Sequence, residues 1–265
     1  MKSRFIIILI LILALGTFSC TKKQSNLPDE TLKVSEFRTI PSFKAMFLAL
    51  DKLEETKLSN LPLAQVIPAQ KDTIHYAFAW GVLSSDAQLA IASKNQNQLT
   101  SITDQFIAIA PQLGLTQYGY QLRDAVKPEI KNRDWLLLRE VFYAMQTSVD
   151  TLMLSNNREL DLTFIYLGSW TESTYQIAQL IAKDYSTEKT RTLQTDAWED
   201  LAYNLSLIQN KYKYKDKTPL LSQTIELVNT IQNTLSSGTA EALTLEQVET
   251  IIEHTKTLRE LYLKS

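Results

Sequence analysis

The residue types that most often perform catalysis are sparse in this chain. Histidine occurs only at His75 and His254, and neither has a glutamate three residues before it, as the Glu-x-x-His pairs of di-iron helical bundles require. Asp72 precedes His75 by three, so the two share one face of a helix. Neither a Gly-x-Ser-x-Gly sequence nor a glycine-rich phosphate loop occurs. The sequence predicts no metal site and no cofactor, and it favours a non-catalytic protein over an enzyme.

One short stretch mixes acids with aromatic side chains, as sugar-binding clefts do. It consists of Asp196, Trp198, Glu199, Asp200 and Tyr203. Two carboxylates suffice to hydrolyse a glycosidic bond when burial keeps one of them protonated. An enzyme that acts on envelope glycans is therefore one hypothesis, while the simpler interpretation is a solvated helix face.

The only cysteine, Cys20, follows a short apolar run. Met1–Arg4 carries two positive charges, and Phe5–Gly16 is almost wholly Ile, Leu and Ala. A cationic start, an apolar core and small residues before a cleavage point are typical of a secretory signal. At about 1.5 Å per residue, the apolar run is short for a hydrocarbon layer of roughly 30 Å. A cleaved leader is therefore favoured over an anchoring helix.

This leader resembles the signal peptide of a bacterial lipoprotein, whose cysteine becomes the lipid-bearing first residue. Ser19 fits the family pattern, whereas Thr17 stands where the family has leucine and Phe18 where it has a small residue. The resemblance implies that residues 1–19 are removed and that Cys20 is acylated, with roughly 0.8 kcal/mol of membrane binding for each buried methylene. No acidic residue follows Cys20 directly, and the resemblance to lipoproteins of enteric type then implies export to the outer membrane of the cell envelope, on either of its faces.

Residues 20–40 are predicted to form the lipidated end and a flexible tether. Thr21–Thr39 is polar and lacks periodicity, and as a coil it would span on the order of 25 Å. The remaining residues, 41–265, are predicted to form one helical domain. With 27 basic and 29 acidic residues, the chain has no charge excess that suggests nucleic acid as a partner.

Apolar residues in the domain recur at spacings of three and four, which is the helical period. The sequence predicts an all-α fold, either a helical bundle or an array of helical hairpins, with about eight to nine helices. Their expected ranges are 42–57, 69–94, 97–112, 116–130, 133–155, 158–184, 188–212, 219–236 and 244–263. The expected caps are Asn132, Thr187 and Thr244, with Gly238 as a helix stop.

A weak internal repeat aligns residues 76–81 with 163–168 and places Gly81 opposite Gly168, 87 positions later. An internal duplication with halves 41–131 and 132–265 would explain it. A glycine within a helix costs about 1 kcal/mol relative to alanine, so each glycine needs a reason. The simpler reason is a close helix crossing. The alternative is a groove for a ligand, lined by the glycines together with Trp80 and Trp170.

The function is inferred mainly by exclusion. The leading hypothesis is a membrane-tethered, non-catalytic lipoprotein that binds a protein partner or supports an envelope complex. One alternative is a ligand-binding or transport accessory module with a groove near Gly81 and Gly168, and the other is the glycan enzyme. The only basic run, Lys211–Lys217, is interpreted as a helix end, or else as a contact with anionic lipid or polysaccharide.

Overall fold

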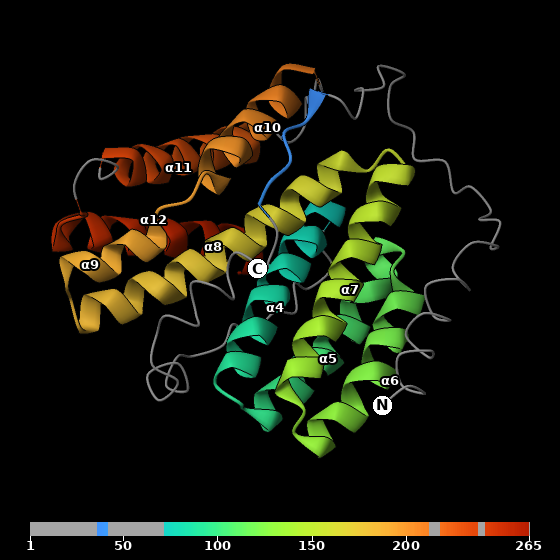
Figure 1. Ribbon diagram of the computed structural model, residues 1–265. Coiled ribbons are helices and arrows are strands. Elements are labelled where there is room, and N and C mark those ends of the chain that lie inside the picture. The colour runs from blue at the N-terminus through green and yellow to red at the C-terminus, as the bar shows by residue number, and fades with distance from the viewer. Residues whose placement is uncertain (1–35, 42–71, 212–217, 238–241, 265) are drawn as a thin grey trace. The chain divides into compact units, whose positions relative to one another are not determined.

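The computed structural model describes residues 36–41, 72–211, 218–237 and 242–264, and these contain helices but no β-strand. The prediction of an all-α bundle of about eight helices is confirmed (Figure 1). Among the described helices, none combines the length and the hydrophobicity that a membrane crossing needs. The helices are α4 (Thr73–Ala92), α5 (Gln96–Ile109), α6 (Thr116–Asn132), α7 (Trp135–Ser155), α8 (Glu159–Lys183), α9 (Thr187–Thr190), α10 (Ala197–Lys211), α11 (Thr218–Ser237) and α12 (Leu245–Leu263).

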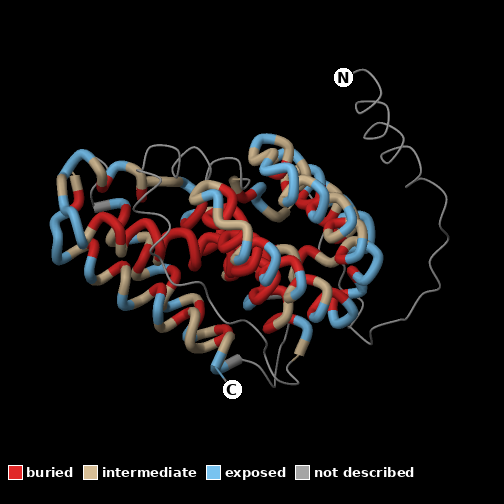
Figure 2. Tube along the Cα trace, turned by 90° about the horizontal axis from the view of Figure 1, so that it is seen from below, coloured by how far each residue is buried: buried red, intermediate tan, exposed pale blue. Residues whose placement is uncertain are grey.

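Helices α4 and α8 form the centre of the described structure and make the most extensive contact of any helix pair. Helix α4 is buried almost without interruption from Ile74 to Ile91, and Figure 2 shows long buried stretches in the interior. A helix without a solvent-facing polar side is enclosed by other elements. Helix α4 therefore buries its polar residues as well as its apolar ones, among them Ser84, Asp86 and Gln88.

The two central helices meet at the repeated glycines. A Cβ atom on Gly81 would lie 1.9 Å from the backbone oxygen of Ile165, and one on Gly168 would lie 2.0 Å from the backbone oxygen of Phe78. Neither position has room for any side chain, because the obstructing atoms belong to the backbone of the facing helix. The close crossing expected from the sequence is confirmed.

The two glycine contacts are equivalent to each other when the chain is aligned with itself at the predicted shift of 87 residues. The shift carries Gly81 onto Gly168, and it carries Phe78 onto Ile165, the two residues whose backbone oxygens the glycines face. Further along both helices, Asp86 of α4 contacts Gln176 of α8, so the two helices run in the same direction past each other. The pair therefore has the contact pattern of two equivalent helices related by an approximate twofold axis.

The surrounding helices follow the same pattern. Along the chain, α4 contacts α5, α5 contacts α6 and α6 contacts α7, while α8 contacts α10, α10 contacts α11 and α11 contacts α12. The last helix of each series contacts the central helix of its own series, because α7 contacts α4 and α12 contacts α8. It also contacts the central helix of the other series, because α7 contacts α8 and α12 contacts α4. Helices α4 and α8 thus each lead a series of helices, and the two series meet at the contact between α4 and α8.

The predicted helix 188–212 is wrong as a single element. Helix α9 is followed by a 3-10 turn at Arg191–Leu193, and α10 begins only at Ala197. The side chain of Thr190 accepts a hydrogen bond from the distant Leu243 N–H at 3.1 Å, and the backbone of Gln194 is extended. A tertiary contact thus fixes the turn that interrupts the helical pattern.

Two of the predicted caps are also displaced. Ser186, not Thr187, caps α9, and Asp134, not Asn132, caps α7. Between the last two residues, Arg133 adopts a left-handed backbone with φ 55° and ends α6. Thr244 caps α12 as predicted, with a reciprocal hydrogen bond from its own N–H to the side chain of Gln247. Gly238 and the predicted helix 42–57 lie outside the described residues.

Alanine substitutions at the crossing provide a direct test. Gly81→Ala and Gly168→Ala are each expected to lower the free energy of unfolding by about 3 kcal/mol, because the helices must separate to admit a methyl group. Gly119→Ala in α6 is the matched control. Its added Cβ would lie 3.1 Å from the Ala110 methyl group and at ordinary van der Waals distances, 3.5 and 3.7 Å, from backbone atoms of Ile107 and Phe106, so a change of about 1 kcal/mol or less is expected. Chemical denaturation of the three variants measures this, and equal effects at all three positions would contradict the crossing.

Candidate functional site

The predicted acidic and aromatic cluster is divided between the two faces of α10. Trp198 is buried, and its indole N–H donates to the Thr174 hydroxyl of α8 at 3.2 Å. Asp196, Glu199 and Tyr203 are exposed, and Asp200 is partly buried. The acids and Trp198 therefore do not converge on one cleft, because the indole points into the core.

The outer face of α10 instead binds residues 36–41 of the same chain, which lie beside it in Figure 1. The guanidinium of Arg38 donates to Glu199 at 2.8 Å, lies 3.5 Å from Asp200 and sits over the ring of Tyr203, 4.3 Å from its centroid. The Asn204 side chain accepts from the Arg38 N–H at 2.8 Å and donates to the Arg38 carbonyl at 3.0 Å. The predicted polar cluster is thus a docking surface for the end of the predicted tether.

Trp170 also contacts this segment. Its indole N–H donates to the carbonyl oxygen of Pro41 at 3.2 Å, and Ile40 between the two polar anchors is buried. Residues 36–41 are therefore held at α10 by a charged group and at α8 by a backbone carbonyl. Sequence reasoning missed Arg38 and Asn204, which no local motif marks.

Arg38 is the cation shared by the carboxylates of Glu199 and Asp200 on α10. The hydrogen bond to Glu199 raises the pKa of Arg38, and burial raises the pKa of Asp200 against the opposing effect of the guanidinium. Both carboxylates therefore act as acceptors for the same cation. This arrangement suits recognition of a positive charge better than acid–base catalysis.

The predicted groove at the central glycines is not present in the described residues. The space beside Gly81 and Gly168 is filled by the backbone of the facing helix. Trp80 is fully buried and packs edge-on against Phe106 of α5, with 4.6 Å between ring centroids. Trp170 is occupied with Pro41. The two tryptophans thus belong to separate packing contacts and do not line one site.

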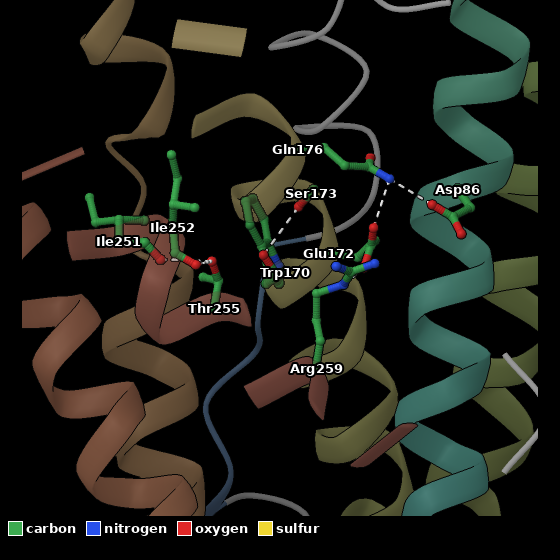
Figure 3. Close-up of polar contacts among 9 residues, drawn as sticks. All are labelled: Asp86, Trp170, Glu172, Ser173, Gln176, Ile251, Ile252, Thr255 and Arg259. Carbon is green, nitrogen blue, oxygen red and sulfur yellow. Dashed lines mark hydrogen bonds and ion pairs between the residues drawn. The ribbon is translucent and has the colours of Figure 1, made fainter. Parts of the chain in front are cut away.

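A polar cluster that sequence reasoning missed lies between α4, α8 and α12 (Figure 3). The amide of Gln176 donates to Asp86 at 2.6 Å and to Glu172 at 2.9 Å. Arg259 of α12 pairs with the other oxygen of Glu172 at 2.5 Å. Both acids are fully buried. The four side chains join three helices through one continuous set of hydrogen bonds.

Burial controls the electrostatics of this cluster. It raises the pKa of Glu172, and the charge and hydrogen bond of Arg259 oppose that rise, helped by Gln176. Arg259 is held in place by the ring of Tyr175, whose centroid is 4.3 Å away. A sequence signal existed, since Glu172 is the only charged residue between Asp161 and Lys183. A lone charge in a long apolar helix requires a partner, although its identity is not encoded nearby.

A second missed group joins α7 to α8. Asp150 accepts a hydrogen bond from the Tyr166 hydroxyl at 2.8 Å and another from the Gln146 amide at 2.5 Å. Burial raises the pKa of Asp150 to about 6, and the two hydrogen bonds oppose the rise. The carboxyl therefore changes its protonation between mildly acidic and neutral pH.

Asp72 and His75, the pair noted in the sequence, lie at the start of α4. Asp72 caps the helix by accepting from the His75 N–H, and its carboxylate also lies 2.7 Å from Nδ1 of His75. The His75 ring packs against Tyr262 of α12, with 5.3 Å between centroids. Within the described ranges, no three His, Cys, Asp or Glu side chains are grouped so that they could hold a metal ion. The pair serves to cap and pack the helix.

Comparisons of the chain with models of known protein families, with curated proteins and with solved structures find no match. The contacts of the described residues are therefore the basis for a functional assignment. The most specific of these contacts is the recognition of residues 36–41 by α10 and α8.

Removing the cation of the buried cluster is expected to destabilise the fold strongly. Arg259→Ala leaves Glu172 buried without its ion pair, and the free energy of unfolding should fall by about 3–5 kcal/mol at neutral pH. The pKa of Glu172 then rises further, so the loss grows as the pH rises above the ordinary glutamate range. The double variant Arg259→Met with Glu172→Met should be less destabilised than Arg259→Ala. Denaturant titration at several pH values measures this, and a double variant as unstable as the single one would refute the pairing.

Asp150 should make stability depend on pH with a known sign. Its pKa is higher in the folded chain than its ordinary value near 3.8, so the folded state binds the proton more tightly. The stabilisation of the fold by protonated Asp150 is fully present below the ordinary pKa near 3.8. It is lost as the pH rises through about 6. Between pH 4 and pH 7, the free energy of unfolding of Asp150→Asn should therefore rise relative to that of the wild type by on the order of 1–3 kcal/mol. A parallel pH dependence in both proteins would show that Asp150 is not the group responsible.

Proposed function

We propose that this chain is a membrane-tethered, non-catalytic lipoprotein whose helical domain binds a protein partner in an envelope complex. The observation that carries the proposal is the order of features along the chain. A leader that resembles a lipoprotein signal ends at Cys20, a polar stretch follows, and residues 36–41 are then bound to α10 and α8. In this proposal the lipid lies at Cys20, and the segment bound to α10 and α8 follows the polar stretch.

The chemistry of the acidic cluster supports a binding role over a catalytic one. Glu199 and Asp200 share Arg38 as their cation, and Trp198 is directed away from them into the core. A carboxylate pair that hydrolyses a glycosidic bond needs one protonated acid and access for the sugar between the two groups. Carboxylates that share a guanidinium on a helix surface are better suited to recognise a positive charge.

Lipidation is tested by labelling cells with a radioactive fatty acid. The wild-type chain is expected to carry label and to partition into the detergent phase, because several acyl chains anchor firmly. Cys20→Ala should lose both properties, since the sequence contains no other thiol. Ser19→Ala is the matched control, as it keeps the cysteine and a small residue before it. An unlabelled wild-type chain would refute the lipid anchor.

The partner is tested by cross-linking in native membranes, followed by purification and mass spectrometry. A single stoichiometric partner is expected with the wild-type chain and a reduced yield with Cys20→Ala, because the anchor concentrates the domain at the membrane. A labelled chain without any stoichiometric partner would contradict the binding role while leaving the anchor intact.

A further inference from the structure

We propose that the outer face of α10 is a peptide-binding site, which residues 37–41 occupy within the chain and which an extended, arginine-containing segment of the partner occupies by exchange. The inference rests on the proposed function for the existence of a partner. The exchange itself is a property of this chain and is measurable without the partner.

The first element of the site recognises backbone. Asn204 accepts from the N–H of Arg38 and donates to the carbonyl of that same residue. The N–H and C=O of one residue point to the same side only where the chain is extended, as in a β-ladder. Asn204 is buried, so its amide is held in one orientation. It therefore selects an extended backbone independently of sequence.

The second element recognises the side chain. The guanidinium of the bound arginine meets Glu199, Asp200 and the face of the Tyr203 ring. These three groups surround the cation with two charged acceptors and one aromatic surface, and a guanidinium satisfies both kinds of contact better than an ammonium group. The acidic character of the face also disfavours an anionic lipid or polysaccharide as its occupant.

The third element lies toward α8 and sets the direction of the bound segment. Ile40, two residues after the arginine, is buried, and the next carbonyl accepts from the Trp170 indole. The site therefore recognises an arginine, an apolar residue two positions later and the backbone carbonyl of the residue after that. A partner segment with this pattern fits in the same register.

The contacts are of the kind that exchange readily. The Arg38 side chain is 43% exposed and that of Glu199 is 59% exposed, so water and salt weaken their ion pair. Among residues 36–41, Ile40 is buried and Phe37 is partly buried against the core, so two apolar side chains hold the segment. Occupancy by the chain's own segment is favoured by its high effective concentration beside α10. A competing segment that is itself concentrated at the membrane overcomes this advantage.

The test uses a fluorescent peptide with the sequence of Ser35–Ser42 and the full chain in detergent. The double variant Arg38→Ala, Ile40→Ala removes the guanidinium and the buried side chain of the chain's own segment, which then competes less well for the site, so the variant is expected to bind the peptide at least about tenfold more tightly than wild type does. Adding Asn204→Ala to the double variant should remove that gain, and a peptide with alanine in place of its arginine should bind more weakly. Equal binding by wild type and the double variant, or binding insensitive to Asn204, would overturn the proposal.

A measurement on the unaltered chain covers the case in which the variants fold poorly. Hydrogen exchange at the Arg38 amide, which donates to Asn204, should accelerate when excess peptide displaces residues 37–41. Exchange that stays constant with peptide in excess would refute displacement. Fatty-acid labelling and peptide exchange are separate readouts, so failure of the anchor leaves the peptide result standing, and failure of exchange leaves the anchor standing.

Discussion

The backbone contact between α4 and α8 is the constraint on which the rest of the described structure depends. At Gly81 and Gly168 each helix lies against carbonyl oxygens of the other, at a separation that excludes even a methyl group. Small residues at a crossing allow helices to approach until backbone atoms touch. Each central helix also carries its own series of neighbours, so the crossing fixes where the two helical sets meet.

Close approach creates a second requirement, which is that polar groups near the crossing find partners. Helix α8 meets it in part, with a directional contact to each of α4, α7, α10 and α12, whereas the Thr171 hydroxyl is buried without a hydrogen-bond partner. Gln176 reaches Asp86 of α4, Glu172 reaches Arg259 of α12, Tyr166 reaches Asp150 of α7 and Thr174 reaches Trp198 of α10. Apolar packing alone tolerates rotation of a helix about its axis, whereas these hydrogen bonds do not. Buried polar contacts of this kind add specificity of arrangement more than net stability.

The sequence was most informative where the cause is local. Helical periodicity predicted the fold class, and two glycines in helix interiors predicted the crossing, because an unfavourable residue there must serve a packing need. Thr244 was recognised as a cap from its own neighbours. In contrast, the interruption before α10 depends on a hydrogen bond between Thr190 and Leu243, residues that no sequence window contains together.

The site could be predicted only in part for the same reason. Glu199 and Asp200 were selected from the sequence, but their partner Arg38 is more than 160 residues away in the sequence. Trp198 was grouped with them by proximity in the chain, although helical geometry directs it to the opposite face. Positions 196, 199, 200 and 203 share one face at spacings of three and four, so the separation of Trp198 was already implied. Lone charges such as Glu172 were a usable signal that was overlooked.

The buried helix crossing and the exposed Arg38 contacts differ in how easily they open when force is applied to the proposed tether. The crossing at Gly81 and Gly168 is buried and surrounded by helices, whereas the Arg38 contacts are exposed to water and salt. Local opening follows the regions with the least burial. A pull on the proposed tether therefore releases residues 36–41 from α10 first. Trp198 holds α10 to α8 from its other face, so the helix keeps its position when the segment leaves. Release of the segment exposes the side chains of Glu199, Asp200 and Asn204 that it contacts and leaves the helical core unchanged.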